Sequence, residues 1–194
     1  MFEYLMPALW TRSFPGTLLA NTQSAVVHVQ RAFAEKQGLP WGISESGGAT
    51  RNDSGHYHYH AYGIPQISAW GEATAGPVIS PYSTFLTLSI DPSAAIQNLR
   101  KMESAKWLGA FGLYEAADYT ASRRSPALVK EWMAHHQGMS LLAITNLLCG
   151  DVVQRWFHAN PLVQATELLL HETPVRKSTL RARMKELAPL GAGN

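Results

Sequence analysis

Apolar residues recur at helical spacing in several segments of the chain. In residues 17–37 they occupy Leu18, Leu19, Ala25, Val26, Val29 and Phe33, and Gly38-Leu39-Pro40 follows as a stop signal. Asp91-Pro92, Ser125-Pro126 and Asn160-Pro161 each place a residue that favours the N-cap or a turn before a proline. They predict helices that reach Met102, that end at Cys149-Gly150, and that carry Leu162 to Leu169. Residues 178–188 predict an amphipathic terminal helix or a frayed tail. The pattern therefore predicts an all-α fold.

The stretch from residue 42 to residue 81 differs from these segments. Glycine, proline and aromatic residues dominate it, and its apolar positions follow no clear period. It is long for a structureless connection in a compact domain, so we expect a functional loop or a small strand pair. Loops on rigid scaffolds often carry binding and catalytic residues.

One carboxylate in this stretch lies among small residues and aromatic rings. Glu45 occurs in Trp41-Gly42-Ile43-Ser44-Glu45-Ser46, and the tyrosine-rich and histidine-rich segment 55–63 follows closely. Pyranose rings stack their C–H faces on Trp and Tyr, and cleavage of an acetal needs a carboxylic acid to protonate the leaving oxygen. Glu45 is therefore the candidate acid. The alternative is a helix cap or a solvated surface residue.

Composition limits the class of protein. The 194 residues are 46% hydrophobic and 15% charged, which fits one domain, residues 1–194, with a sizeable core. The net charge is +2 and basic residues are scattered, so no nucleic-acid-binding patch is predicted. Cys149 is the single cysteine, which fits a reducing compartment, and its apolar surroundings predict a buried small hydrophobe. We find neither a signal-type segment nor a run long enough to span a membrane.

Six motifs occur in an order that carries a family resemblance. They are residues 1–7 (MFEYLMP), 40–46 (PWGISES), 61–65 (AYGIP), 80–84 (SPYST), 112–116 (GLYEA) and 133–140 (MAHHQGMS). Together they resemble the glucoamylase-like domain of cyclic β-1,2-glucan synthases, from Met1 to about Arg176. Each motif alone is weak, and their order and spacing make the resemblance specific.

The resemblance implies a fold and a reaction. It implies helical hairpins of an (α/α)6 toroid whose loops form a glucan-binding cleft. The implied reaction is a retaining transglycosylation that closes linear β-1,2-glucan into a ring, with endo-hydrolysis as a close neighbour. Domains of this family are longer, so the chain is expected to be the C-terminal half of such a domain and to form an incomplete toroid. The implied location is the cytoplasmic side of a bacterial inner membrane, without direct insertion.

The resemblance also assigns residues. Glu45 matches the family's acid/base, and a retaining mechanism needs a second carboxylate about 5 Å away, which is expected in the upstream segment. The substrate-binding candidates are Glu3, Trp41, Tyr59, Tyr62, Tyr82, Tyr114, Glu115, His135, His136 and Gln137. Glu115 has three open interpretations: it binds a sugar hydroxyl, it raises the pKa of Glu45, or it pairs with an arginine.

The histidines and tryptophans require separate interpretations. His56, His58 and His60 would share one face of a strand, but zinc needs further ligands, so no metal and no cofactor are predicted. His135 and His136 are consecutive and point about 100° apart on a helix, so they either donate to glucan hydroxyls or are core histidines. Trp41 is the expected stacking platform. The tryptophans expected in the core are Trp10, Trp107, Trp132 and Trp156.

Two classes of function remain open. One is an enzyme fragment that acts on β-1,2-glucan through Glu45. The other is a glucan-binding or assembly module that completes a barrel with an upstream segment or with a second subunit. A half-toroid would leave an apolar face uncovered, which predicts self-association or an obligate partner.

Overall fold

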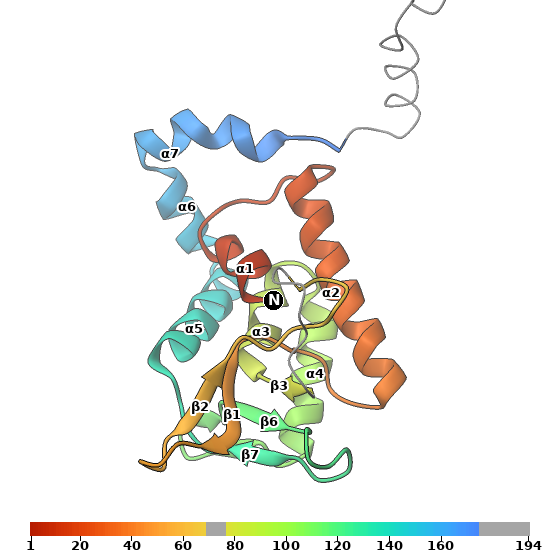
Figure 1. Cartoon of the computed structure of the whole chain (residues 1–194). Coiled ribbons are helices and arrows are strands. Elements are labelled where there is room, and N and C mark those ends of the chain that lie inside the picture. Colours follow the sequence, from red (N-terminus) through yellow and green to blue (C-terminus); the bar gives the residue numbers. More distant parts are fainter. Residues whose placement is uncertain (69–76, 175–194) are drawn as a thin grey trace, which may run out of the picture.

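The computed structural model describes residues 1–68 and 77–174, so the predicted helix at 178–188 lies outside the described residues. Helices predominate in it (Figure 1). The α-helices are α1 (Phe2–Leu5), α2 (Leu18–Gln37), α3 (Pro81–Phe85), α4 (Pro92–Ser104), α5 (Ala134–Leu148), α6 (Val152–His158) and α7 (Pro161–Thr166). The 3-10 helices are η1 (Met6–Leu9), η2 (Leu86–Ser89) and η3 (Glu167–His171).

The sequence signals for helix ends are confirmed at Gly38, Asp91 and Asn160, and the structure adds a further cap at Thr17. Thr17 Oγ1 accepts a hydrogen bond from the Ala20 N–H, and Asp91 accepts one from the Ala94 N–H. Asn160 caps α7 in the same way. Gly38 ends α2 with a φ of 64°, a left-handed conformation that costs glycine little. These ends depend on local chemistry, which explains why the sequence predicts them.

The helix expected from Ser125-Pro126 begins later than predicted. Ala127–Val129 forms strand β7, and α5 starts only at Ala134. The cause is tertiary, because β7 pairs antiparallel with β6 (Ala116–Asp118), which also pairs with β3 (Val78–Ile79). Backbone pairing within the β3–β6–β7 sheet has overridden the local start signal.

The strands correct the all-α expectation to a mainly helical fold with small sheets. Strands β1 (Ser46–Arg51) and β2 (Tyr57–His60) form an antiparallel hairpin in which Gly47 lies opposite Tyr59. This confirms the strand pair predicted as one alternative for residues 42–81. A second hairpin joins β4 (Leu108–Gly109) to β5 (Gly112–Leu113). The β1–β2 hairpin lies beside β6 and β7 in Figure 1.

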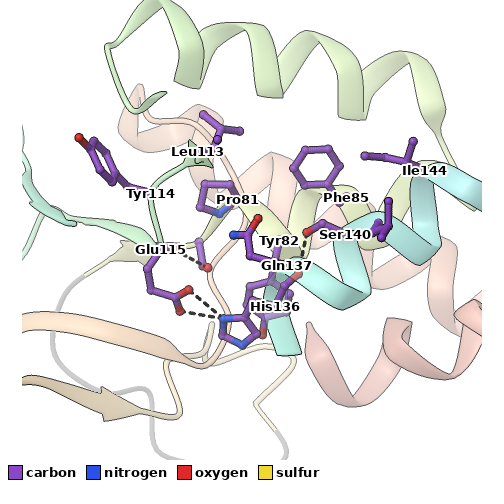
Figure 2. Close-up of a pocket in the computed structure, with 13 residues that line it drawn as sticks. Pro81, Tyr82, Phe85, Leu113, Tyr114, Glu115, His136, Gln137, Ser140 and Ile144 are labelled. Atoms are coloured by element: carbon purple, nitrogen blue, oxygen red, sulfur yellow. Dashed lines mark hydrogen bonds and ion pairs between the residues drawn. The ribbon is translucent and has the colours of Figure 1, made fainter. Parts of the chain in front are cut away.

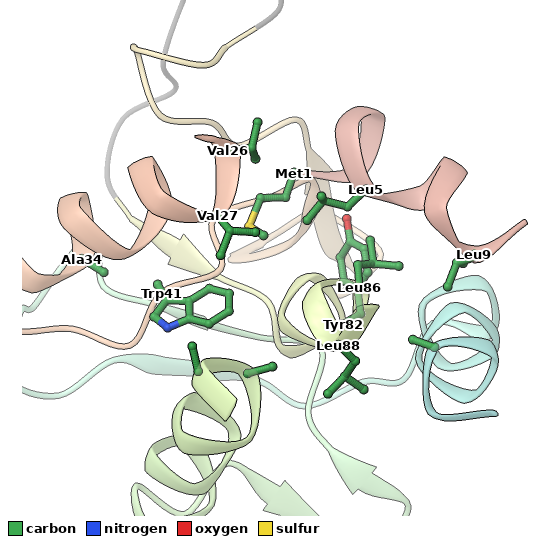
Figure 3. Packing of buried hydrophobic residues seen from close by; sticks show 13 residues of the cluster. Met1, Leu5, Leu9, Val26, Val27, Ala34, Trp41, Tyr82, Leu86 and Leu88 are labelled. Carbon is green, nitrogen blue, oxygen red and sulfur yellow. The ribbon is translucent and has the colours of Figure 1, made fainter. Parts of the chain in front are cut away.

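The main apolar core lies between α1, α2, α3, α4 and α5 (Figure 3). Its most buried side chains include Leu5, Leu86 and Ala95, which are at most 1% exposed. Trp41 belongs to this cluster and is 7% exposed. A second cluster surrounds Trp107, the tryptophan for which the core prediction is confirmed.

Several residues expected in the core lie at the surface. Trp156 is 70% exposed, Trp10 is 37% exposed, and Trp132 is half-buried. Cys149 is exposed, because α5 ends there and the chain turns at Gly150. Helical spacing marks one face of a helix as apolar, but it does not say whether another element covers that face.

The second half of the chain carries many uncovered apolar side chains. From α5 to η3 the exposed ones are Leu141, Leu147, Leu148, Trp156, Phe157, Leu162, Leu168 and Leu169. We call the segment α6, α7 and η3 the arm. It extends from the end of α5 past the start of α2 (Figure 1). A backbone hydrogen bond of 2.6 Å from the Leu18 N–H to the Glu172 oxygen holds its far end there.

Candidate functional site

Two helices fix the backbone that leads to Glu45. The Gln30 side chain of α2 bonds both backbone groups of Ile43, donating to its oxygen at 2.7 Å and accepting from its N–H at 3.0 Å. The Asn98 side chain of α4 does the same for Trp41, at 2.8 Å and 3.1 Å. Both amides are buried, so these bonds are shielded from water. Glu45 therefore follows a segment with a well-defined position.

The half-buried Glu45 carboxylate has a tyrosine hydroxyl as its neighbour. Tyr59 hydrogen-bonds Glu45, and its pKa is raised, first by burial and then by the Glu45 charge. The phenol therefore stays protonated and donates. The Tyr82 hydroxyl donates to the Glu45 backbone oxygen at 3.0 Å and lies 2.9 Å from Ser44 Oγ. Burial raises the pKa of Tyr82 as well.

A buried carboxylate–imidazole pair adjoins Tyr82, the residue that bonds the Glu45 backbone. The two Glu115 oxygens lie 2.8 Å and 3.0 Å from His136 Nδ1, and both side chains are 1% exposed. The Tyr82 ring stacks on the His136 ring with centroids 3.6 Å apart and planes 7° apart. Glu115 thus pairs with a histidine, where the sequence had left open an arginine.

His136 has one nitrogen in use and one free. Its Nε2 atom is buried and has no hydrogen-bond partner among the described residues. A buried polar atom without a partner is costly unless a ligand or water satisfies it. His136 therefore combines the two interpretations that the sequence left open, because it is buried in the core and yet keeps a nitrogen available.

Two further candidates lie on the Glu45 side of the hairpin. The exposed His135 ring lies 6.2 Å from the Tyr59 ring. Burial, and then the charge of His136, lowers the pKa of His135. Glu3 is also exposed, and its charge contributes to the raised pKa of Tyr59.

A pocket of about 240 Å³ adjoins the Glu115–His136 pair (Figure 2). Five sequence-predicted residues line it, namely Tyr82, Tyr114, Glu115, His136 and Gln137. Its other walls are mainly apolar and include Pro81, Phe85, Leu113 and Ile144. The structure thus brings together side chains from α3, α5 and the segment between β5 and β6. The Glu115–His136 pair is the polar floor of this pocket.

Two sequence-predicted residues lie elsewhere. Trp41 packs in the core, so its ring cannot serve as the expected stacking platform. Tyr62 lies against Gly48 and close to Asp118. Since successive residues of a strand point to opposite faces, Gly48 and Gly47 mark the two sides of the hairpin, and Tyr62 is on the side away from Tyr59.

Sequence analysis missed Glu131, which is a further carboxylate near the site. Its Oε1 atom is buried without a partner among the described residues, and it would lie 2.6 Å from a Cβ added at Gly47. Burial, and then the charge of Glu115, raises the pKa of Glu131. The signal was hidden because the predicted helix from Ser125 covered this position. Glu131 in fact follows the end of β7.

The remaining histidines form no metal centre in the described parts of the chain. His58 and His60 stack on the hairpin side opposite Tyr59, with ring centroids 4.7 Å apart. Within residues 1–68 and 77–174, no three His, Cys, Asp or Glu side chains are placed to hold a metal ion. The helices described there include none with the length and apolarity needed to cross a bilayer.

Comparison with known proteins gives a consistent family. The chain is 36% identical over 197 residues to NdvB, the cyclic β-(1,2)-glucan synthase of Rhizobium meliloti strain 1021. That match covers all of this chain and 7% of the synthase. The chain therefore spans a small part of the length of this relative.

Solved structures share the fold. A β-1,2-glucanase from Parabacteroides distasonis aligns with a TM-score of 0.61 and 17% identity, over 88% of this chain and 24% of that one. An endo-β-1,2-glucanase from Chitinophaga pinensis, in complex with sophorotriose and glucose, aligns with a TM-score of 0.56 and 20% identity. It covers 79% of this chain and 35% of that one. The likeness supports a helix-rich glucoamylase-like fold.

The family comparison covers most of the chain. The model of the Glycoamylase family, described as "Putative glucoamylase", matches residues 1–161. The matched region contains α1 to α6 and every site residue discussed above. The chain belongs to the Glycoamylase family.

Proposed function

We propose that the chain forms part of a domain that acts on β-1,2-glucan, with Glu45 as general acid and then general base. The observation that carries this proposal is the half-buried Glu45 carboxylate, which is hydrogen-bonded by Tyr59, a residue whose ring also lies near His136 of the buried Glu115–His136 pair. The relatives named as β-1,2-glucan synthase and β-1,2-glucanases support the choice of substrate.

The proposed reaction is retaining transglycosylation that closes a ring, or endo-hydrolysis. Glu45 protonates the glycosidic oxygen while a second carboxylate attacks the anomeric carbon and forms a glycosyl-enzyme. Glu45 then removes the proton from the incoming hydroxyl, which belongs to the glucan's own end in cyclisation and to water in hydrolysis. His136 Nε2, His135 and Gln137 are suited to hydrogen-bond glucan hydroxyls beside this carboxylate.

The second carboxylate has two possible sources. The family resemblance places it in an upstream segment outside this chain. Glu131 is a source inside the chain, because its Oε1 atom, unpaired among the described residues, lies against Gly47 on the same hairpin side as Tyr59. Burial and the charge of Glu115 raise the pKa of Glu131. If Glu131 is the nucleophile, activity should therefore start to fall at a higher pH than it would for an ordinary glutamate.

The test combines binding and product analysis. Calorimetric titration with linear β-1,2-gluco-oligosaccharides should show binding that matched β-1,3 and β-1,4 oligomers do not. Linear β-1,2-glucan is then incubated with the chain, with Glu45→Gln and with Glu131→Gln, and the products are separated by mass. If products form and Glu131→Gln keeps wild-type turnover, the second carboxylate is not Glu131. Turnover that survives Glu45→Gln would contradict the assignment of the acid.

A second candidate is an assembly module, and the exposed apolar side chains favour it. Leu148 and Trp156 are 76% and 70% exposed, and Leu168 is 81% exposed. Exposed apolar side chains of this number and size are typical of surfaces that another protein segment covers. If this face is covered by a second copy, light scattering after size exclusion should show dimers whose fraction rises with concentration. A monomer at all concentrations would exclude that arrangement.

A further inference from the structure

The two sides of the β1–β2 hairpin carry different chemistry. Tyr59 lies opposite Gly47 in the register, and both belong to the side that faces Glu115 and His136. His60 lies opposite Ser46, so it belongs to the other side, because neighbouring positions alternate. The proposed function uses only the first side.

A groove of about 460 Å³ lies on the second side. Its lining includes Thr50, His60, Tyr62, Asp118, Thr120 and Ala127. The volume falls within the range of about 300–1,000 Å³ that is usual for ligand pockets. The groove is separate from the pocket beside His136, and the two share no lining residue.

The aromatic wall of this groove is held in place. The Tyr62 hydroxyl end occupies the space that a Cβ at Gly48 would need, so only glycine at this position lets the ring lie against the strand. The His60 ring meets the Tyr62 ring edge-on, with centroids 5.7 Å apart and planes 68° apart. Burial, and then the Asp118 charge, raises the pKa of Tyr62, so its hydroxyl stays a donor beside that carboxylate.

Asp118 supplies acceptors at the base of the groove. It is 8% exposed, and its two oxygens accept the N–H groups of Ala49 at 2.9 Å and Thr120 at 2.8 Å. Each carboxylate oxygen can accept a further hydrogen bond. None of the described lining residues is lysine or arginine, so the groove is unsuited to an anion.

We propose that this groove is a second carbohydrate-binding site, in which a glucosyl unit packs against Tyr62 and His60 and donates hydroxyl hydrogen bonds to Asp118. A neutral ligand with an apolar C–H face and several hydroxyls fits this combination of rings and acceptors. The ligand class rests on the proposed function. The site would hold glucan on the far side of the hairpin from Glu45 without cleaving it.

The test maps binding residue by residue on the ¹⁵N-labelled full chain, with sophorotriose as the probe. We expect saturable amide shifts at Ala49, Thr120 and Ala121, with a dissociation constant different from that of shifts near Tyr59 and His135. Ala127→Trp fills the groove and should raise the dissociation constant reported by the shifts at Ala49, Thr120 and Ala121 at least tenfold. Tyr59→Ala should remove the shifts near His135 and leave the dissociation constant of the groove within twofold of the wild-type value.

The controls separate this proposal from the proposed function. Ala159→Trp makes the same change at an exposed position after α6, and both sets of shifts should persist. His60→Ala is the second groove variant if Ala127→Trp does not fold. Shifts on the Tyr59 side alone would overturn the second site and leave the proposed function intact. Shifts in the groove alone would support the second site and contradict the proposed function. Loss of both sets in Tyr59→Ala, or retention of the groove shifts in Ala127→Trp, would also overturn the second site.

Discussion

The site region and the arm differ in how far contacts within this chain bury and pair their side chains. Around Glu45, several buried polar groups find partners in distant segments of this chain. Gln30 bonds the Ile43 backbone, and Ser80 Oγ donates to the Glu115 backbone oxygen at 2.6 Å. In the arm, Leu162 and Leu169 are 78% and 76% exposed. The difference teaches that the polar groups of the site are largely paired within this chain, whereas the described residues do not cover the apolar side chains of α7 and η3.

The largest effect should come from breaking the buried pair. Glu115→Leu leaves His136 buried without its carboxylate and should lower the free energy of unfolding by about 3–5 kcal/mol. Urea unfolding measures it, with Glu103→Leu on an exposed position of α4 as the matched control. A loss no larger than that of the control would mean that the polar floor contributes nothing to the fold.

A smaller loss in the free energy of unfolding should follow from removing the side-chain amide of Asn98. Asn98→Ala leaves both backbone groups of Trp41 without this partner and should cost about 2–4 kcal/mol. Gln97→Ala, on the exposed side of the same helix, should change the free energy of unfolding by less than about 0.5 kcal/mol. Equal effects of the two substitutions would contradict the role given to Asn98.

In the arm the same measurement should register almost nothing. Leu168→Ser combined with Leu169→Ser should change the free energy of unfolding by less than about 0.5 kcal/mol, because both side chains are exposed. Any self-association seen by light scattering should decrease. If the double variant instead unfolds readily, these leucines pack within the chain and the contrast with the site region disappears.

The smallest effect concerns pH. The pKa of His135 is lowered below 6.5, so the folded state binds fewer protons than the unfolded state. Stability should therefore fall as the pH drops through 6.5, and His135→Gln should show less of this loss. Urea midpoints on either side of that pH measure it, with the exposed His28→Gln on α2 as control. An unchanged slope would show that His135 is not linked to folding.

Sequence analysis predicted well where local chemistry decides. Asp91 and Asn160 cap helices within three residues of themselves, so no distant contact is needed to predict those starts. The strand pair after Glu45 was also within reach as one of two alternatives. The start expected at Ser125 was wrong because β7 pairs with β6, which no local pattern records.

The site was predicted in composition better than in arrangement. The structure gathers Glu45, Tyr59, Glu115 and His136 as a group. The six motifs contain three of these residues, and Tyr59 was among the substrate-binding candidates. Trp41 was misassigned because an aromatic residue near a carboxylate in sequence can point into the core. Tyr62 was grouped with Tyr59 because the strand register, which sends them to opposite sides, cannot be known from the chain alone.

The amide bonds of Gln30 and Asn98 have a consequence for motion. Side chains from two helices hydrogen-bond the Trp41 and Ile43 backbone, and Ile43 also bridges antiparallel to Ile79 of β3. Release of this segment requires α2 or α4 to move as well, so the amide protons of Trp41 and Ile43 should exchange with solvent only when the whole fold opens. The backbone that leads to Glu45 would then keep its place as long as the protein stays folded.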